Sequence, residues 1–455
     1  MKGPYPAQPD PFGRLAKQAE ALRRHLSSWT CSGSEWESLQ LLHGGLDRFL
    51  RDRVDDAAID ERGSFGNEIL EHARNLGLFG LSIPQEHGGF GFTLKACCEV
   101  VQRIAYHDRS LGVTVGLHAG LGTRPLVAYG SEELKGRHLP RMASGETIGC
   151  FCATEPEAGS DIASLKTRAV LDGDRFVLNG SKAFVTNAGL AGLATVVART
   201  DGLDGSRRGH SLLLVPLDLP GIELGPEEHK LGIRGSSTRP IYFEGVRLPR
   251  TNLLGEPNRG LDQLGYVLCW GRTIMAAGCL GLARRALRTA TEHVAGRKQF
   301  GRALAQFPAV QRMLAERKTE LHLMKLLLRA CGQFEADRPG SISWESALAK
   351  VFCSEAAWRA CDDCLQLHGG SGFIEDTGVA LLLRDARIGR IFEGANEVLR
   401  HHMGLGLIGA GKSGEHVASL CETAGIDGEP RSRLESMAQR LDGAIEGLKK
   451  RYGVR

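Results

Sequence analysis

Residues 151–161 read Phe151-Cys152-Ala153-Thr154-Glu155-Pro156-Glu157-Ala158-Gly159-Ser160-Asp161, and at this stretch the sequence changes from a helical pattern to a strand pattern. Before it, from about Leu15 to Thr147, apolar residues recur at helical spacing. After it, as far as about Gly255, short apolar and β-branched runs are separated by turn signals. From about Leu261 the helical spacing returns. This order predicts helices, then a sheet, then helices.

The strand region contains short apolar runs bounded by turn residues. The runs are Phe176–Leu178, Ala194–Ala198, Leu212–Val215 and Ile241–Phe243. Asp172-Gly173 precedes the first of them and follows another apolar run, which predicts a hairpin. The further turn signals are Asn179-Gly180, Pro220-Gly221 and Pro249-Arg250. Strands joined by such short turns predict an antiparallel sheet.

The composition is that of a globular chain without a nucleic-acid footprint. The 57 basic and 53 acidic residues nearly balance, for a formal net charge of +4. The 12 cysteines show no disulfide framework, and Cys361-Asp362-Asp363-Cys364 falls in a predicted helix without metal-ligating partners. We therefore expect no metal site and no nucleic-acid partner. No uncharged apolar stretch of about 18 residues is present, so no transmembrane segment is expected.

The two ends of the chain differ from its middle. The first residues contain four prolines and no apolar run, which predicts a partly disordered lead-in over residues 1–40 and no secretory signal. The glycine-rich segment Gly404–Gly414 predicts a helix end and a linker. Beyond it, one apolar stripe has helical spacing: Leu434, Met437, Ala438, Leu441, Ile445 and Leu448. A packed tail helix is the favoured interpretation, and a helix on a membrane surface is the alternative.

Two segments of the strand region combine residues suited to a flat polar ring. Residues 151–161 offer small residues and hydroxyls that let backbone N–H groups approach a ligand closely. In Asn179–Ala188, Phe184 and Thr186 are two positions apart and should share one face of a strand. An aromatic wall beside a hydroxyl suits an isoalloxazine, whereas a core Phe with a capping Thr is the alternative.

Three later segments carry charge and glycine. Arg297-Lys298-Gln299-Phe300-Gly301 follows a long predicted helix, and its arginine suits a pyrophosphate. The glycines of Gln366–Phe373 permit close backbone approach to a phosphate or a ring edge. In Arg384–Glu397, Glu393 stands between Phe392 and Gly394. A carboxylate in an apolar pocket has a raised pKa and can act as a base. The alternative for Glu393 is an exposed residue at a helix start.

Together and in this order, the five segments resemble the acyl-CoA dehydrogenase family. The resemblance extends from about Leu46 to Leu407. Within the family, the very-long-chain branch is the most similar, through Lys350–Trp358, Phe392–Arg400 and the extra C-terminal tail. The resemblance implies an α+β fold with an N-terminal helical domain (41–147), a middle antiparallel β domain (148–258), a C-terminal four-helix bundle (259–413) and a helical extension (414–455).

The family resemblance also implies an FAD site shared between two subunits of a homo-oligomer. The residues expected to contact the cofactor are Phe151, Ala153, Thr154, Gly159, Ser160, Phe184, Thr186, Arg297, Phe300, Gln366, Gly369, Gly370, Ala395 and Glu397. Phe184 stands where Trp is usual, and Ala395 where Thr is usual. FAD is thus expected to lie between the β domain and the bundle.

The implied reaction is the dehydrogenation of a saturated acyl-CoA to a trans-2-enoyl-CoA. Glu393 matches the catalytic base, and Gly271 stands where a minority of members place it. Substrate contacts are expected from Ser160, Arg272, Phe392 and Gly394. The implied hydrogen bonds to the thioester carbonyl come from the Glu393 N–H and a flavin ribityl hydroxyl. The expected electron acceptor is an electron-transfer flavoprotein, and the expected location is a bacterial cytoplasm or a mitochondrial matrix.

Two other functions stay open at this point. The same fold could act on a carrier-protein thioester or use oxygen as an oxidase, because Cys269 and Trp270 replace the Asp or Asn that is usual beside Arg272. A non-catalytic assembly role is the other possibility, which the loss of a hydroxyl at Ala395 favours. Retention of Glu393, Thr154 and Thr186 argues for catalysis.

Overall fold

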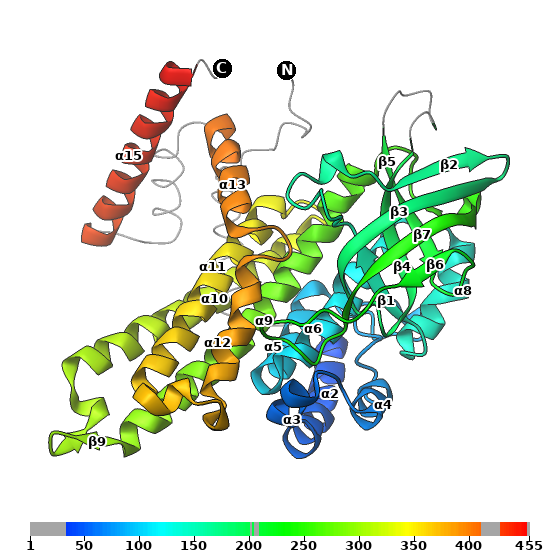
Figure 1. Cartoon of the computed structure of the whole chain (residues 1–455). Coiled ribbons are helices and arrows are strands. Elements are labelled where there is room, and N and C mark those ends of the chain that lie inside the picture. The colour runs from blue at the N-terminus through cyan, green and yellow to red at the C-terminus, as the bar shows by residue number, and fades with distance from the viewer. Residues whose placement is uncertain (1–32, 201–202, 204–208, 411–427, 453–455) are drawn as a thin grey trace. The chain divides into compact units, whose positions relative to one another are not determined.

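The computed structural model describes residues 33–200, 203, 209–410 and 428–452, in two compact units. The first unit spans Gly33–Ala395, and the described part of the second contains the helices that follow Asn396. Helices, sheet and helices follow one another in the first unit, as the sequence predicts (Figure 1). Most of the predicted lead-in lies outside the described residues, but residues 33–40 belong to the first described helix.

The N-terminal part is helical. Its elements are α2 (Gly33–Arg53), α3 (Asp56–Arg62), α4 (Asn67–Asn75), η1 (Gln85–His87), α5 (Leu94–His107), α6 (Arg109–Leu117), the π-helical turn η2 (His118–Gly122), α7 (Arg124–Tyr129) and α8 (Glu132–Ala143). Side-chain caps define several starts: the Asp55 carboxylate accepts from the Ala58 N–H, and Asp108 accepts from the Leu111 N–H. Asp108 also ends α5, so one residue makes the corner between two helices.

A mixed sheet follows. Its strands are β1 (Ile148–Cys152), β2 (Arg168–Asp172), β3 (Arg175–Thr186), β4 (Ala191–Arg199), β5 (His210–Pro216), β6 (Ile222–Leu224), β7 (Thr238–Pro249) and β8 (Leu253–Leu254), with the short turns η3 (Ile162–Ser164) and η4 (Arg250–Asn252). The order is β6-β7-β3-β2-β4-β5-β8, with β1 beside β4. Most pairs are antiparallel, but β1 and β2 each run parallel to β4.

The turn predictions have different outcomes. Asp172 pairs with Arg175, so the predicted hairpin joins β2 to β3. The prediction of a turn at Asn179-Gly180 is wrong, because both residues lie inside β3. The pairing register with β7 shifts between Leu178 and Gly180, and Gly180 has a φ of 140°. A glycine in a strand interior marks a bulge as readily as a turn.

The middle strands are buried on both faces. In β4 and β5, Val197 and Leu212 join a core cluster that includes residues of α7, α8 and α9. Their neighbours Val196 and Leu213 join a second cluster on the other face, with Phe176. This alternation explains the continuous apolar runs of the sequence, because successive side chains on a strand point to opposite faces.

The C-terminal helices of the first unit pack against one another. They are α9 (Gly260–Gly296), α10 (Pro308–Asp337), α11 (Ser343–His368) and α12 (Val379–Arg387), connected by β9 (Lys298–Gln299), β10 (Arg302–Ala303), η5 (Leu304–Gln306), η6 (Gly369–Phe373), η7 (Glu375–Thr377) and η8 (Ile388–Arg390). α9 is long and apolar enough to cross a membrane, a helix that the sequence criterion did not identify. Its most apolar window is 83% buried inside the protein, as in a core helix. Cys361 and Cys364 are buried in α11 as free thiols.

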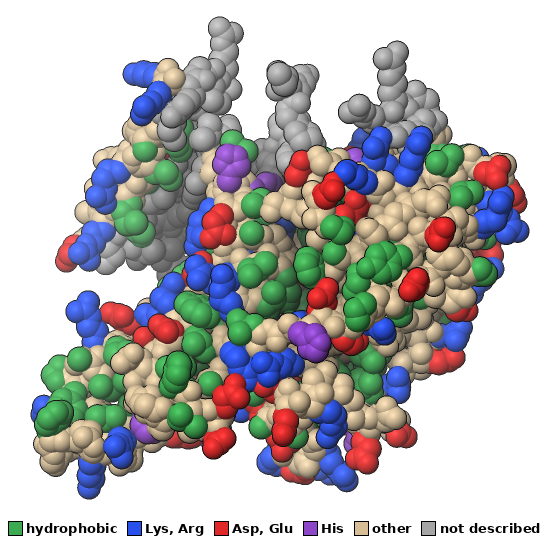
Figure 2. Space-filling view, viewed as in Figure 1, with side chains coloured by type: hydrophobic (Ala, Val, Ile, Leu, Met, Phe, Trp, Pro, Cys, Tyr) green, Lys and Arg blue, Asp and Glu red, His purple; other side chains and the backbone are tan. Residues whose placement is uncertain are grey.

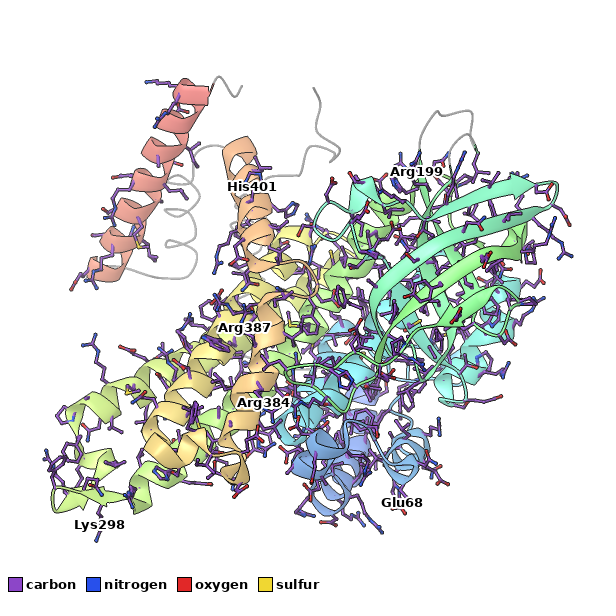
Figure 3. The ribbon with its side chains drawn as sticks, viewed as in Figure 1. Glu68, Arg199, Lys298, Arg384, Arg387 and His401 are labelled. Carbon is purple, nitrogen blue, oxygen red and sulfur yellow. The ribbon has the colours of Figure 1, made fainter. Side chains whose placement is uncertain are left out.

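Polar contacts join the three parts of this unit. Arg384 on α12, which is labelled in Figure 3, donates to both carboxylate oxygens of Asp60 on α3, at 3.0 and 2.5 Å, and to the Leu231 carbonyl at 3.0 Å. The next residue, Asp385, accepts from the Ile233 N–H at 2.5 Å. On the face shown in Figure 2, acidic and basic side chains are interspersed, in keeping with the near-balanced charge.

The second unit contributes α13 (Asn396–Ala410) and α15 (Gly428–Tyr452). α13 ends at Ala410, within the segment Gly404–Gly414 where the sequence predicts a helix end, and residues 411–414 of the predicted linker lie outside the described part. α15 carries the predicted apolar stripe. Ala438 and Ile445 are buried, whereas Leu434, Met437 and Leu441 are exposed.

Candidate active site

Glu393 follows η8 in a turn at the end of the first unit, with a left-handed φ of 58°. The residue is half-buried, but its Oε2 atom is buried, and no donor in the described part of the chain reaches it. Burial raises the pKa of Glu393 to about 7, against the opposing effect of the Arg272 and Lys350 cations. A buried carboxyl that titrates near neutral pH and has no partner is suited to accept a proton from a ligand.

Two cations hold the backbone that follows the Glu393 side chain. Arg272 Nε on α9 donates to the Glu393 carbonyl at 3.1 Å. Lys350 Nζ on α11, which is fully buried, donates to the Gly394 carbonyl at 2.7 Å. A non-glycine residue in the left-handed region costs about 1–2 kcal/mol. These two hydrogen bonds restrain the turn in that conformation.

A missing side chain on α9 makes room for the carboxylate. A Cβ atom added at Gly271 would lie 2.7 Å from Glu393 Oε2 and 2.6 Å from Leu121 Cδ2. Leu121 belongs to the π-helical turn η2, and its neighbour Gly120 also packs on Gly271. Three segments far apart in sequence thus converge on one carboxylate: η2, α9 and the turn after η8. The Glu393 carboxylate thus occupies space that a side chain at position 271 would fill.

The unusual residues before Gly271 contact other side chains. Trp270 donates from Nε1 to Glu335 Oε1 at 2.9 Å, and the Arg124 guanidinium lies 3.9 Å from the centre of its ring. Cys269 is buried, with its Sγ 3.2 Å from the Gly265 carbonyl. Burial raises the pKa of Glu335, and hydrogen bonds from Trp270 and the Gly340 N–H oppose this. Trp270 therefore helps to fix α9 against α7 and α10.

The loop after β1 carries the first group of residues predicted to contact FAD. The ring of Phe151 is packed in the core between helices and sheet, while Ala153 and Thr154 are half-buried. Gly159 and Ser160 are exposed. The Thr154 carbonyl accepts from the Ala183 N–H at 2.9 Å, which joins this loop to the second predicted segment on β3.

Phe184 and Thr186 lie beside a second irregularity of β3. The register with β7 shifts between Lys182 and Val185, and both of these residues are buried although three positions separate them. Phe184 therefore has a φ of 54° and is 65% exposed. Thr186 is half-buried and separated from Phe184 by the buried Val185. An exposed aromatic ring with a nearby hydroxyl forms a surface against which a flat ring can stack.

The predicted pyrophosphate residues lie at the other end of the bundle. Arg297 caps α9, and Phe300, with a φ of 52° and 92% exposed, is at the tip of the β9–β10 hairpin. Gln366 lies in the last turn of α11, and Gly369 and Gly370 begin η6. His293 and His368 stack with ring centres 3.9 Å apart, so the ends of α9 and α11 are adjacent. Lys298 of this hairpin lies far from Arg387 (Figure 3), and Arg387 is the residue that is close in sequence to the Glu393 turn.

The remaining predicted residues are adjacent to Glu393 in sequence. Phe392, Gly394 and Ala395 are half-buried, and Gly394 has a φ of 97°. Glu397 is exposed in the first turn of α13, in the second unit, with Arg400 3.7 Å away.

Four residues near the site were not singled out from the sequence: Lys350, Lys182, Leu121 and Arg124. A signal existed for Lys182, since it continues the inward alternation of Phe176 and Leu178 along β3. Lys350 interrupts the apolar face of α11 in a similar way. No local pattern marks Leu121 or Arg124, because their contacts are formed by distant segments.

All three parts of the chain match acyl-CoA dehydrogenases. Residues 37–146 match the N-terminal domain of that family, 150–246 the middle domain and 258–408 the C-terminal domain. The chain therefore belongs to the acyl-CoA dehydrogenase family. It is 38% identical over 343 residues to the probable acyl-CoA dehydrogenase YngJ of Bacillus subtilis, which covers 75% of this chain and 90% of that protein.

A relative from the very-long-chain branch and a solved structure extend the comparison. The mitochondrial very long-chain specific acyl-CoA dehydrogenase of Mus musculus is 33% identical over 430 residues. That match covers 93% of this chain but only 64% of the mouse protein. A glutaryl-CoA dehydrogenase of Mycobacterium smegmatis, solved in complex with FADH2, superposes with a TM-score of 0.74 at 29% identity, over 82% of this chain and 94% of that one.

The protein is thus an FAD-dependent oxidoreductase by family. Its own residues fit that cofactor: the exposed Phe184 ring offers a stacking surface, and Thr154 and Thr186 carry hydroxyls on the two segments that the Ala183–Thr154 backbone hydrogen bond joins. The buried, unpartnered Glu393 Oε2 suits a reacting substrate beside it.

Proposed function

We propose that this protein dehydrogenates a saturated acyl-CoA thioester to the trans-2-enoyl-CoA, with Glu393 as the base that removes the α-proton. The observation that carries the proposal is the Glu393 carboxylate, whose Oε2 is buried without a partner and whose pKa is raised to about 7. A base with a pKa near the working pH is both ionised and able to hold the proton that it takes.

The surrounding residues orient the reacting groups. Arg272 and Lys350 hold the Glu393-Gly394 backbone, so the carboxylate and the Glu393 N–H keep fixed directions. We assign that N–H to the thioester carbonyl, where it would favour the charge that develops when the α-proton leaves. Phe392 and Gly394 would line the acyl chain, and the exposed Ser160 would contact the CoA part. FAD, when bound, supplies the acceptor for the β-hydride.

We further assign the FAD contacts to the residues that the family resemblance implies. Phe151, Ala153, Thr154, Gly159, Ser160, Phe184, Thr186 and Ala395 would surround the flavin half. Arg297, Phe300, Gln366, Gly369, Gly370 and Glu397 would serve the pyrophosphate and adenosine half, in part across a homo-oligomer interface. The exposure of Phe300 (92%) and Phe373 (79%) in the single chain favours such a partner surface.

The cellular context follows from the same chemistry. We propose an electron-transfer flavoprotein as the acceptor, fatty acid β-oxidation as the process, and a cytoplasmic or mitochondrial-matrix location. Bacterial and mitochondrial relatives support the location.

An anaerobic titration with a panel of saturated acyl-CoAs tests the proposal. The visible absorbance of the oxidised flavin is followed for the native chain and for Glu393→Gln. We expect a thioester to bleach the flavin of the native protein only, and the panel then brackets the chain length. A flavin that no acyl-CoA bleaches would overturn the substrate, and bleaching by a carrier-protein thioester alone would replace it. Release of peroxide on admission of air, without reduction of an electron-transfer flavoprotein, would identify an oxidase. A protein without flavin would support the assembly role.

A further inference from the structure

A lysine ammonium group lies fully buried in the β part of the protein. Lys182 on β3 has no accessible surface, and its Nζ donates to Glu155 Oε1 at 2.8 Å and to the Ala153 carbonyl at 3.1 Å. The Glu155 side chain is 5% exposed. Desolvation of two charges offsets most of their attraction, so a buried ion pair is weak evidence for a gain in stability. What the pair holds in place is therefore the better guide to its role.

On one side, the pair fixes the loop that follows β1. The Glu155 carboxylate accepts from the Lys166 N–H at 2.6 Å and from the Thr167 N–H at 3.0 Å, in addition to Lys182. Three donors from two segments thus converge on one carboxylate. The loop that contains Ala153 and Thr154 is tied both to the start of β2 and to β3.

On the other side, the pair fixes the irregular part of β3. Lys182 is the last residue before the register shift, and the next residue, Ala183, donates its N–H to the Thr154 carbonyl at 2.9 Å. Phe184 follows with its left-handed φ of 54°. A bulky residue adopts this conformation only where flanking contacts restrain it. The Lys182 ammonium is one of these contacts.

We propose that Lys182 and Glu155 are positioning residues for the flavin site. They lock the loop bearing Thr154 to the bulged strand bearing Phe184 and Thr186, so that two hydroxyls and an aromatic ring from separate segments stand at fixed distances. The inference rests on the proposed flavin contacts of those three residues. Neither charged group needs to touch the cofactor, because their effect passes through the backbone of Ala153 and Ala183.

The test compares Lys182→Met with Lys166→Met. Lys166 lies in the same region, but its ammonium pairs with Glu157 on the surface, with both side chains 70% exposed, so its loss is a matched control. FAD affinity and the visible absorption spectrum of the resting protein are measured without substrate. We expect Lys182→Met to weaken FAD binding by about tenfold or more, since truncating one partner of a buried pair is costly, and to shift the flavin band. Lys166→Met should change neither.

A double variant separates positioning from folding. Lys182→Met alone leaves the Glu155 carboxylate buried without its cation, whereas Lys182→Met/Glu155→Gln removes both charges and is expected to melt close to the native temperature. We expect the double variant still to bind FAD more weakly, with a shifted band, because the Ala153 carbonyl has lost its donor. A folded double variant with native FAD affinity and spectrum would overturn the proposal, and so would a native protein that binds no FAD.

These readouts need no acyl-CoA. If no thioester reduces the flavin but the variants change its affinity and spectrum as expected, the substrate assignment fails and the positioning role stands. If thioesters reduce the flavin and the variants leave affinity and spectrum unchanged, the positioning role fails alone.

Discussion

Replacing Gly271 by alanine adds one methyl group at the most crowded point of the proposed site. The new Cβ would lie 2.7 Å from Glu393 Oε2, and 2.6 and 3.0 Å from Leu121 Cδ2 and Cγ. Ordinary carbon contacts need about 3.5–4.0 Å, so the carboxylate or Leu121 must move by roughly 1 Å. A misplacement of that size can lower a chemical rate by about 10²-fold.

The stability of this variant should change far less than its rate. Overpacking costs about 1–3 kcal/mol, whereas alanine in place of glycine inside a helix gains about 1 kcal/mol. The net effect on the free energy of unfolding should therefore lie between about 0 and 2 kcal/mol of destabilisation. The flavin itself should stay bound, because α9 keeps its path.

Stopped-flow reduction of the flavin by an acyl-CoA, under anaerobic conditions, measures the rate, and calorimetry measures stability. Gly265→Ala is the matched control, since it lies on the same helix and an added Cβ there meets nothing within 4 Å. That control should melt slightly higher and reduce its flavin at the native rate. Native-rate reduction in Gly271→Ala would refute the placement of the carboxylate against this glycine.

Three further outcomes are expected. Glu393→Gln should raise the free energy of unfolding at pH 8 by up to about 3 kcal/mol. The native carboxyl has a pKa near 7 in the folded chain in place of 4.5, so it favours the folded state fully only below about pH 4.5. Chemical denaturation of both proteins at pH 8 and at about pH 4.5 checks this, and equal stability of the two proteins at pH 8 would contradict it. Lys350→Met removes a cation that lowers the pKa of Glu393, so the acid limb of the pH–rate profile should move to higher pH; an unmoved limb would count against it. Trp270→Phe leaves Glu335 without its indole donor and should cost about 1–3 kcal/mol in urea unfolding, with a result near zero excluding a role for this hydrogen bond.

The layered fold was predictable because each part has its own periodicity. Helical spacing, paired apolar runs and the Asp172-Gly173 hairpin all survive in the structure. The parallel pairing of β1 with β4 was not predictable, since it joins segments about 40 residues apart whose apolar pattern is the same in either direction. The turn predicted at Asn179-Gly180 was wrong because the same dipeptide occurs in turns and in bulges. Only pairing with the partner strand β7 decides which one forms.

The site was partly predictable, for a related reason. Glu393, Phe184 and Thr186 stand in segments whose residue types suggest their chemistry. The groups that hold these residues in place could not be predicted in this way. Lys350, Leu121 and Lys182 act through contacts that form only when distant segments fold together. The left-handed φ values of Phe184 and Glu393 were also hidden, since neither residue type favours that conformation.

The central claim is that Glu393 removes a proton from the carbon next to a thioester carbonyl. It is tested most directly by anaerobic flavin reduction with an acyl-CoA carrying hydrogen or deuterium at that carbon, in the native chain and in Glu393→Gln. We expect native reduction to be slower with deuterium and to weaken as the pH falls below about 7, where the carboxylate takes up a proton. The variant should not reduce its flavin with either substrate. Reduction of the variant at the native rate, with no effect of deuterium in either protein, would contradict the claim.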